Sequence, residues 1–182
     1  MTLARLIACL AVVAAVVAAC GSQSGSQLTR GHSAPAAVSP TTGQIVPAQL
    51  QFTAKTLDGH DFSGQGLLGK PAVLWFWAPW CPVCQREAPA VGQIAAAHPA
   101  VTFVGVAGLD MDTAPAMQEF VSKYPVNGFT ELADTDGVVW AKFGVTRQPA
   151  YAFIRPDGGI DVVKQPLSDA DLSQRVTALV NP

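Results

Sequence analysis

Two cysteines three residues apart are the strongest chemical signal in this sequence. Cys81 and Cys84 flank Pro82 and Val83, and no other cysteine occurs beyond residue 20. The loop that this pair would close is too short to stabilise the fold much by restricting the unfolded chain. A pair at this spacing can instead alternate between dithiol and disulfide, so we expect it to carry out thiol–disulfide exchange.

Zinc binding is the main alternative for such a pair. A structural zinc site needs four ligands, normally two cysteine pairs or one pair with two histidines. The sequence has no second pair, and His60 and His98 are isolated from each other. We therefore expect no metal and no other cofactor at Cys81 and Cys84.

The elements around the cysteines place them at a strand–helix junction. Residues 72–77 form a short apolar run with three aromatic residues, which indicates a buried central strand. Residues 82–98 begin with a proline, are rich in helix formers and are followed by another proline, which predicts a helix. At the start of that helix, partial positive charge and free N–H groups favour a thiolate. We expect Cys81 to be the partly exposed attacking thiolate and Cys84 to be the buried resolving thiol.

The rest of the pattern alternates strands with helices. We expect a leading hairpin over residues 50–62, a strand over 101–107, a helix over 113–124, a short helical turn over 138–143, a hairpin over 150–164 and a closing helix over 168–180. This order predicts an α/β fold with a mixed central sheet, helices on both faces and an N-terminal β-hairpin extension.

The N-terminal part carries targeting signals. An apolar run follows Arg5 and ends at Cys20, and it is too short to span a membrane. Its last residues, Val-Ala-Ala-Cys, resemble the lipobox of bacterial lipoproteins. The resemblance implies a signal peptide over residues 1–20 and lipidation of Cys20, which would anchor the chain to the cell membrane. An ordinary cleaved secretory signal is the alternative, and either signal places the mature protein outside the cytoplasm, where disulfides persist.

A linker and one domain follow the signal. Residues 21–47 are rich in Ser, Gln, Gly, Ala, Pro and Thr and lack hydrophobic periodicity, which is typical of a flexible linker. Residues 48–182 then form a single domain. The net charge is −2, so we expect no binding to nucleic acid.

At this point the motifs show a family resemblance. The aromatic strand leading into Trp80-Cys81-Pro82-Val83-Cys84, and the Gln148-Pro149 step before a later strand, resemble the thioredoxin superfamily. Over residues 48–180 the chain most resembles the secreted DsbE/DsbF-like (TlpA-like) proteins of mycobacteria. The resemblance implies a thioredoxin fold with Pro149 in the cis form beside the cysteines. The alternative is a trans Pro149 that starts an edge strand.

Aromatic and neighbouring residues divide into a surface set and a core set. The residues expected at the substrate surface are Trp77, Trp80, Pro82, Val83, Gln148 and Pro149. Those expected in the core are Trp75, Phe76 and Trp140.

The sequence departs from the family in one respect. Many thioredoxins carry a buried acid in the strand before the motif, whereas residues 72–77 contain no charged side chain. Asp110, Glu87, Glu131 or water could take the proton of Cys84 instead, and the sequence does not distinguish among them.

The resemblance and the compartment together favour an oxidant that forms disulfides in secreted or membrane proteins containing thiols, with a membrane redox partner. One alternative is a reductant of apocytochrome c thiols in cytochrome c maturation, as the wider family implies. An alternative from another class is a non-catalytic thioredoxin-fold binding module.

Overall fold

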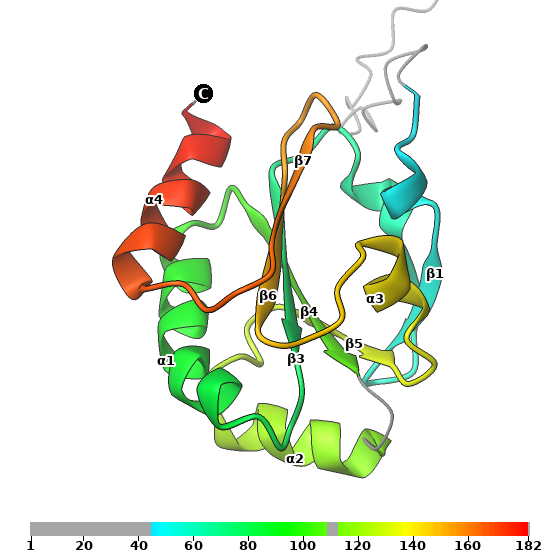
Figure 1. Cartoon of the computed structure of the whole chain (residues 1–182), viewed down its shortest axis with the longest axis vertical. Helices are drawn as coiled ribbons and strands as arrows, with labels where there is room; N and C mark the ends of the chain where they lie inside the picture. The colour runs from blue at the N-terminus through cyan, green and yellow to red at the C-terminus, as the bar shows by residue number, and fades with distance from the viewer. Residues whose placement is uncertain (1–44, 109–112, 182) are drawn as a thin grey trace, which may run out of the picture. The chain divides into compact units, whose positions relative to one another are not determined.

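A seven-stranded mixed sheet with helices on both faces forms the described part of the chain (Figure 1). The computed structural model describes residues 45–108 and 113–181. The strands are β1 (Thr53–Thr56), β2 (Asp61–Ser63), β3 (Ala72–Trp77), β4 (Thr102–Gly108), β5 (Thr130–Asp134), β6 (Ala150–Ile154) and β7 (Ile160–Val163). The helices are α1 (Pro82–Ala97), α2 (Ala114–Lys123), α3 (Val138–Lys142) and α4 (Asp169–Val180), with 3-10 turns at Ala48–Leu50 and Gly64–Leu67.

The strand order places β3 well inside the sheet. The order is β2-β1-β5-β4-β3-β6-β7. β3 pairs in parallel with β4, and β4 pairs in parallel with β5. The hairpins β1–β2 and β6–β7 form the two antiparallel edges. This arrangement confirms the predicted mixed sheet with its leading and late hairpins.

β3 is buried on both faces, so its alternating side chains enter two cores. One core lies under α1 and α4, which are adjacent in Figure 1, and it contains Val73, Trp75 and Trp77. The other lies on the α3 side and contains Ala72, Leu74, Phe76 and Trp140. The predicted core positions of Trp75, Phe76 and Trp140 are confirmed.

β5 is a strand that the sequence analysis missed. Its sequence, Thr-Glu-Leu-Ala-Asp, carries two acids and shows no apolar run. Tertiary contacts supply hydrogen bonds to both acids in the interior, although Glu131 Oε1 has no hydrogen-bond partner among the described residues. Glu131 accepts a hydrogen bond from Trp77, and Asp134 accepts hydrogen bonds from the backbone N–H groups of Val139 and Trp140 at the start of α3. β5 also joins the N-terminal hairpin to the sheet, because it pairs antiparallel with β1.

Some predictions concern residues outside the described ranges. Cys20, the signal peptide, nearly all of the linker and Asp110 belong to this group. Within the described ranges, no helix has the length and apolar character needed to cross a membrane.

Candidate functional site

The β3–α1 junction brings the two cysteines together. Two hydrogen bonds fix the loop between strand and helix: Cys81 N donates to Ala78 O at 3.1 Å, and Gln85 Nε2 donates to Pro79 O at 2.9 Å. α1 then begins at Pro82, whose missing N–H costs nothing in the first turn. Cys81 is therefore the N-cap residue of α1, as the sequence predicts.

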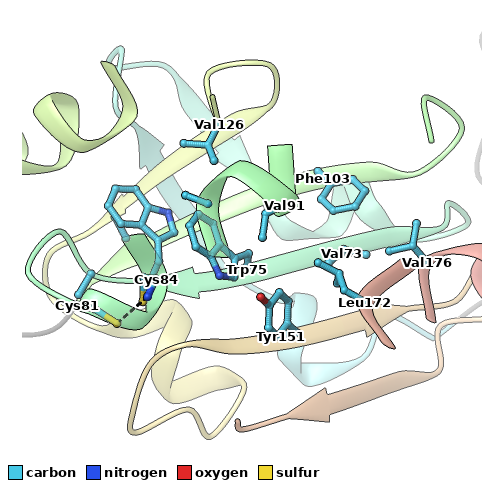
Figure 2. Packing of buried hydrophobic residues seen from close by; sticks show 14 of the residues in the cluster. Val73, Trp75, Cys81, Cys84, Val91, Phe103, Val126, Tyr151, Leu172 and Val176 are labelled. Carbon is cyan, nitrogen blue, oxygen red and sulfur yellow. Dashed lines mark hydrogen bonds between the residues drawn. The ribbon is translucent and has the colours of Figure 1, made fainter. Parts of the chain in front are cut away.

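The sulfur of Cys81 serves as the helix cap. The backbone N–H of Cys84 donates to Cys81 Sγ at 3.1 Å, as the dashed line in Figure 2 shows. Because the sulfur turns back over the first turn of the helix, Cys81 is only 3% exposed, and the predicted partial exposure is wrong. Cys84 is fully buried, as predicted. An N–H donor and a helix N-terminus both stabilise negative charge on the sulfur of Cys81.

Burial sets the proton affinity of Cys84. Desolvation is the main cause that raises the pKa of the Cys84 thiol far above its ordinary value, followed by its hydrogen bond with Cys81. The nearby charge of Glu87 raises this pKa further. Cys84 therefore keeps its proton until a neighbouring base accepts it.

Glu87 lies one helical turn after Cys84 and is half-buried. Its Oε2 accepts a hydrogen bond of 2.7 Å from the hydroxyl of Tyr151, and its Oε1 is buried without a hydrogen-bond partner among the described residues. Burial raises the pKa of Glu87 above its ordinary value, while the hydrogen bond from Tyr151 opposes that rise. Glu87 can thus hold a proton at higher pH than a solvated glutamate and can exchange it near Cys84.

Glu131 on β5 is a second carboxyl on the side of the sheet that α1 covers, and it is buried. It lies directly over Gly105, where a Cβ would overlap its carboxyl group. Its Oε2 accepts a hydrogen bond of 2.9 Å from Trp77 Nε1, and burial raises its pKa well above the ordinary value. Of these two candidates for the proton acceptor, Glu87 is the one whose charge acts on Cys84.

Trp77 belongs to the core and not to the substrate surface, which corrects the prediction. Its side chain is fully buried and stacks on Phe120, with ring centroids 4.2 Å apart. The tertiary structure buries Trp77 because it is the last residue of β3 on the side covered by α1 and α2, where Glu131 satisfies its indole N–H.

The other predicted surface residues surround the junction. Trp80 is 54% exposed, Pro82 is exposed, and Val83 and Gln148 are half-buried. Pro149 is buried, so its predicted place at the surface is wrong. The Gln148–Pro149 peptide bond is cis, as the family resemblance implies. β6 starts directly after it and pairs with the end of β3, so this bond lies at the end of the sheet where the chain turns towards Cys81.

Beside Trp80 lies a groove of about 290 Å³. It is lined by Pro79, Trp80, Gln85, Ala116, Glu119, Phe120, Lys123 and Tyr124. The groove extends the surface near the cysteines toward α2.

Tyr151 is a residue of this site that the sequence analysis did not identify. In the sequence it reads only as part of an apolar strand. Two patterns could have indicated the contact between Tyr151 and Glu87. Glu87 follows Cys84 by one helical turn, and β6 is adjacent to the strand that leads to the cysteines. Only the pairing of Tyr151 with Trp75 across β6 and β3 places its hydroxyl under α1.

These features define a class of protein. A cysteine pair at a strand–helix junction, with a cis-proline step at the same end of a mixed sheet, is the arrangement of a thioredoxin-fold thiol–disulfide oxidoreductase. The chain belongs to the AhpC/TSA family, which it matches over residues 42–163.

Relatives agree with this class. The chain is 55% identical over 136 residues to soluble secreted antigen MPT53 of Mycobacterium tuberculosis, covering 73% of this chain and 77% of the relative. The solved structure of M. tuberculosis DsbF, in mixed oxidized and reduced forms, is 73% identical, with a TM-score of 0.72 over 74% of this chain and 99% of that chain. The structure of a secreted M. tuberculosis disulfide oxidoreductase homologous to E. coli DsbE is 56% identical, with a TM-score of 0.68 over 72% of this chain and 98% of that chain. The expected thioredoxin fold and thiol–disulfide oxidoreductase class are thereby confirmed.

Proposed function

We propose that this protein oxidises cysteine pairs in secreted or membrane proteins outside the cytoplasm. The observation that supports this direction is the hydrogen bond from Cys84 N–H to Cys81 Sγ at the N-terminus of α1. Stabilising a thiolate stabilises the reduced form of the protein, and a stable reduced form makes a stronger oxidant.

The reaction starts from the Cys81–Cys84 disulfide. A client thiolate attacks Cys81 Sγ, the bond between the two cysteines breaks, and its electron pair leaves on Cys84 Sγ. The proton of the Glu87 carboxyl then passes to the Cys84 thiolate. The second client thiol loses its proton to solvent and attacks the client sulfur of the mixed disulfide, which releases Cys81 as a thiolate. Two electrons have moved from client to protein, and the client has gained a disulfide.

The substrate surface in this proposal consists of Trp80, Pro82, Val83 and Gln148, which precedes the buried Pro149. The exposed indole of Trp80 offers apolar contact area next to Cys81. In this proposal an extended client segment contacts the backbone of Gln148, a residue that is half-buried.

The proposal includes a location for the protein. Residues 1–20 are a signal peptide, Cys20 carries the lipid, and residues 21–47 link it to the domain that starts at residue 48. A redox partner in the membrane reoxidises the Cys81–Cys84 pair after each turnover. The secreted relatives support an extracytoplasmic location.

The equilibrium potential of the Cys81–Cys84 couple tests the direction. An oxidant should equilibrate with glutathione buffers at about −180 mV or higher, as protein disulfide isomerase does, whereas thioredoxin lies near about −270 mV. A potential near that of thioredoxin would instead support the reductant of apocytochrome c thiols.

Paired serine variants test the roles of the two cysteines. Cys81→Ser should abolish the oxidative refolding of reduced ribonuclease. Cys84→Ser, incubated with a client protein that carries a disulfide, should accumulate a mixed disulfide between Cys81 and the client, visible as a higher-mass band on non-reducing gels. Cys81 attacks the client disulfide, and no Cys84 thiol is present to resolve the product. Unchanged refolding by Cys81→Ser would exclude catalysis at this pair and favour the non-catalytic binding module.

A further inference from the structure

We propose that Tyr151 is a positioning residue for the redox reaction: its hydroxyl holds the Glu87 carboxyl in place beside Cys84 and determines how tightly that carboxyl holds its proton. The inference rests on the proton-exchange role proposed for Glu87. It adds Tyr151, a residue of β6 that is far from the cysteines in sequence, to the groups that assist the reaction of Cys81 and Cys84.

The geometry joins three elements. Tyr151 is fully buried on β6, and its Oη donates to Glu87 Oε2 on α1 at 2.7 Å. Tyr151 pairs across the sheet with Trp75 of β3. Figure 2 shows the Tyr151 hydroxyl and the Trp75 indole nitrogen turned toward the same space under α1.

The polar atoms in this space are only partly satisfied. Trp75 Nε1 and Glu87 Oε1 are both buried and have no hydrogen-bond partner of ordinary geometry in the part of the chain that the structure describes. Trp75 is nevertheless close enough to help lower the pKa of Glu87. Among the described residues, the Tyr151 hydroxyl is thus the one side-chain donor that meets ordinary hydrogen-bond geometry to this carboxyl, and Oε1 is the oxygen that we assign to proton exchange.

Other groups also face Glu87. The backbone of Leu167, before α4, lowers the pKa of Glu87, and the charge of Asp169 at the start of α4 raises it. On α1 itself, Cys84 lies within electrostatic range of both Glu87 and Tyr151. Among the influences that lower this pKa, the hydrogen bond from Tyr151 is the largest.

The consequence is a defined change in proton affinity. A hydroxyl donor stabilises the carboxylate more than the neutral acid, so it allows a buried glutamate to release its proton at lower pH. Without that hydroxyl, Glu87 should hold its proton to higher pH. The pH dependence of proton transfer between Glu87 and Cys84 would then shift in the same direction as the pKa of Glu87.

Tyr151→Phe removes one oxygen and leaves the buried ring in place. The carbon-NMR titration of the Glu87 carboxyl in the reduced protein should move upward by about one pH unit. The midpoint in the pH profile of single-turnover oxidation of a dithiol peptide should move by the same amount. The chain has only one other tyrosine, Tyr124, and Tyr124→Phe is the matched control that should leave both midpoints in place.

Two further comparisons distinguish a failure of the positioning role of Tyr151 from a failure of the proton-exchange role of Glu87. In a Glu87→Gln background, adding Tyr151→Phe should change the pH profile no further, since the titrating group is absent. An unmoved Glu87 titration in Tyr151→Phe would overturn the positioning role, as would an equal effect of Tyr151→Phe in both backgrounds. Failure of the proposed role of Glu87 would appear separately, as an unaltered pH profile in Glu87→Gln alone.

If Tyr151→Phe fails to fold, the titration of Glu87 in the unaltered protein still tests the positioning role of Tyr151. A Glu87 midpoint that does not change between the reduced and oxidised forms would show that the carboxyl does not exchange with Cys84, and the positioning role would fall with it. A midpoint that changes with redox state, together with exchange protection of the Tyr151 hydroxyl proton, would support it.

Discussion

At the residue scale, half-buried Glu87 and buried Glu131 have similar hydrogen bonds but are expected to play different chemical roles. Glu87 lies on α1 and Glu131 lies on β5, and each accepts a hydrogen bond from an aromatic side chain of the core under α1. Glu87 receives its bond from Tyr151 and acts on Cys84, whereas Glu131 receives its bond from Trp77. We therefore expect Glu87 to affect catalysis and Glu131 to affect mainly stability.

Glu131→Gln should change how stability depends on pH. Because burial raises the pKa of Glu131 well above that of an unfolded glutamate, the folded state keeps the proton while the unfolded state loses it. The wild-type protein should lose stability, by up to about 1.4 kcal/mol per pH unit, as pH rises from about 4.5 to the folded pKa. The variant lacks this loss, so in urea unfolding it should gain stability relative to wild type between pH 5 and pH 8.

The control for this change is Glu119→Gln, which removes an exposed acid from α2. Its unfolding free energy should keep the pH dependence of the wild-type protein. Parallel curves for Glu131→Gln and wild type would show that Glu131 is ionised in the folded protein at all pH values tested.

At the scale of elements, the site depends on where α1 is seated. A Cβ at Gly92, in the middle of α1, would overlap the backbone carbonyl of Pro125, which follows α2. The missing side chain thus lets α1 approach this loop closely. Since α1 carries Cys84 and Glu87, the same contact helps to fix both groups over the sheet.

Gly92→Ala should destabilise the protein although it introduces a better helix former. Alanine in an exposed helix interior normally adds about 1 kcal/mol over glycine. Here the overlap with Pro125 should reverse the sign, with a loss of about 1–3 kcal/mol in denaturant unfolding. Gly66→Ala is the matched control, because nothing lies within 4 Å of a Cβ at Gly66. A stabilised Gly92→Ala variant would show that α1 can move away from Pro125 without cost.

At the scale of the whole molecule, the described domain contains the redox pair, whereas the location depends on the N-terminal signal proposed above. The described domain contains Cys81, Cys84, Glu87, Glu131 and the cis-proline step. The proposed anchor at Cys20 lies in a separate part of the chain. Activity on soluble thiols should therefore not depend on lipidation, whereas reoxidation by a membrane partner should.

Mass spectrometry of the N-terminus tests the anchor. The mature chain from bacterial membranes should begin at Cys20 and carry a diacylglyceryl group on that sulfur. Cys20→Ser should remove the lipid mass and lower the yield in the membrane fraction, because the two acyl chains that would hold the protein on the membrane are absent. Cys9→Ser should change neither, because residue 9 lies in the segment that we propose is removed. A mature N-terminus with an unmodified Cys20 would favour the ordinary secretory signal.

The sequence by itself determined the redox pair, the strand–helix junction and most of the sheet. Local patterns carry this information: a CxxC pair between an aromatic strand and a proline-started helix needs no knowledge of distant residues. The cis form of Pro149 also followed from the sequence, through the family resemblance.

Only the tertiary structure decided which groups surround the pair. The same interaction explains why β5 was not predicted and why Trp77 was predicted at the surface. Trp77 and Glu131, 54 residues apart, form a hydrogen bond in the interior. Tyr151 and Glu87 meet in the same way across 64 residues. Burial of a polar group depends on a partner supplied by another element, and a linear pattern does not contain that partner.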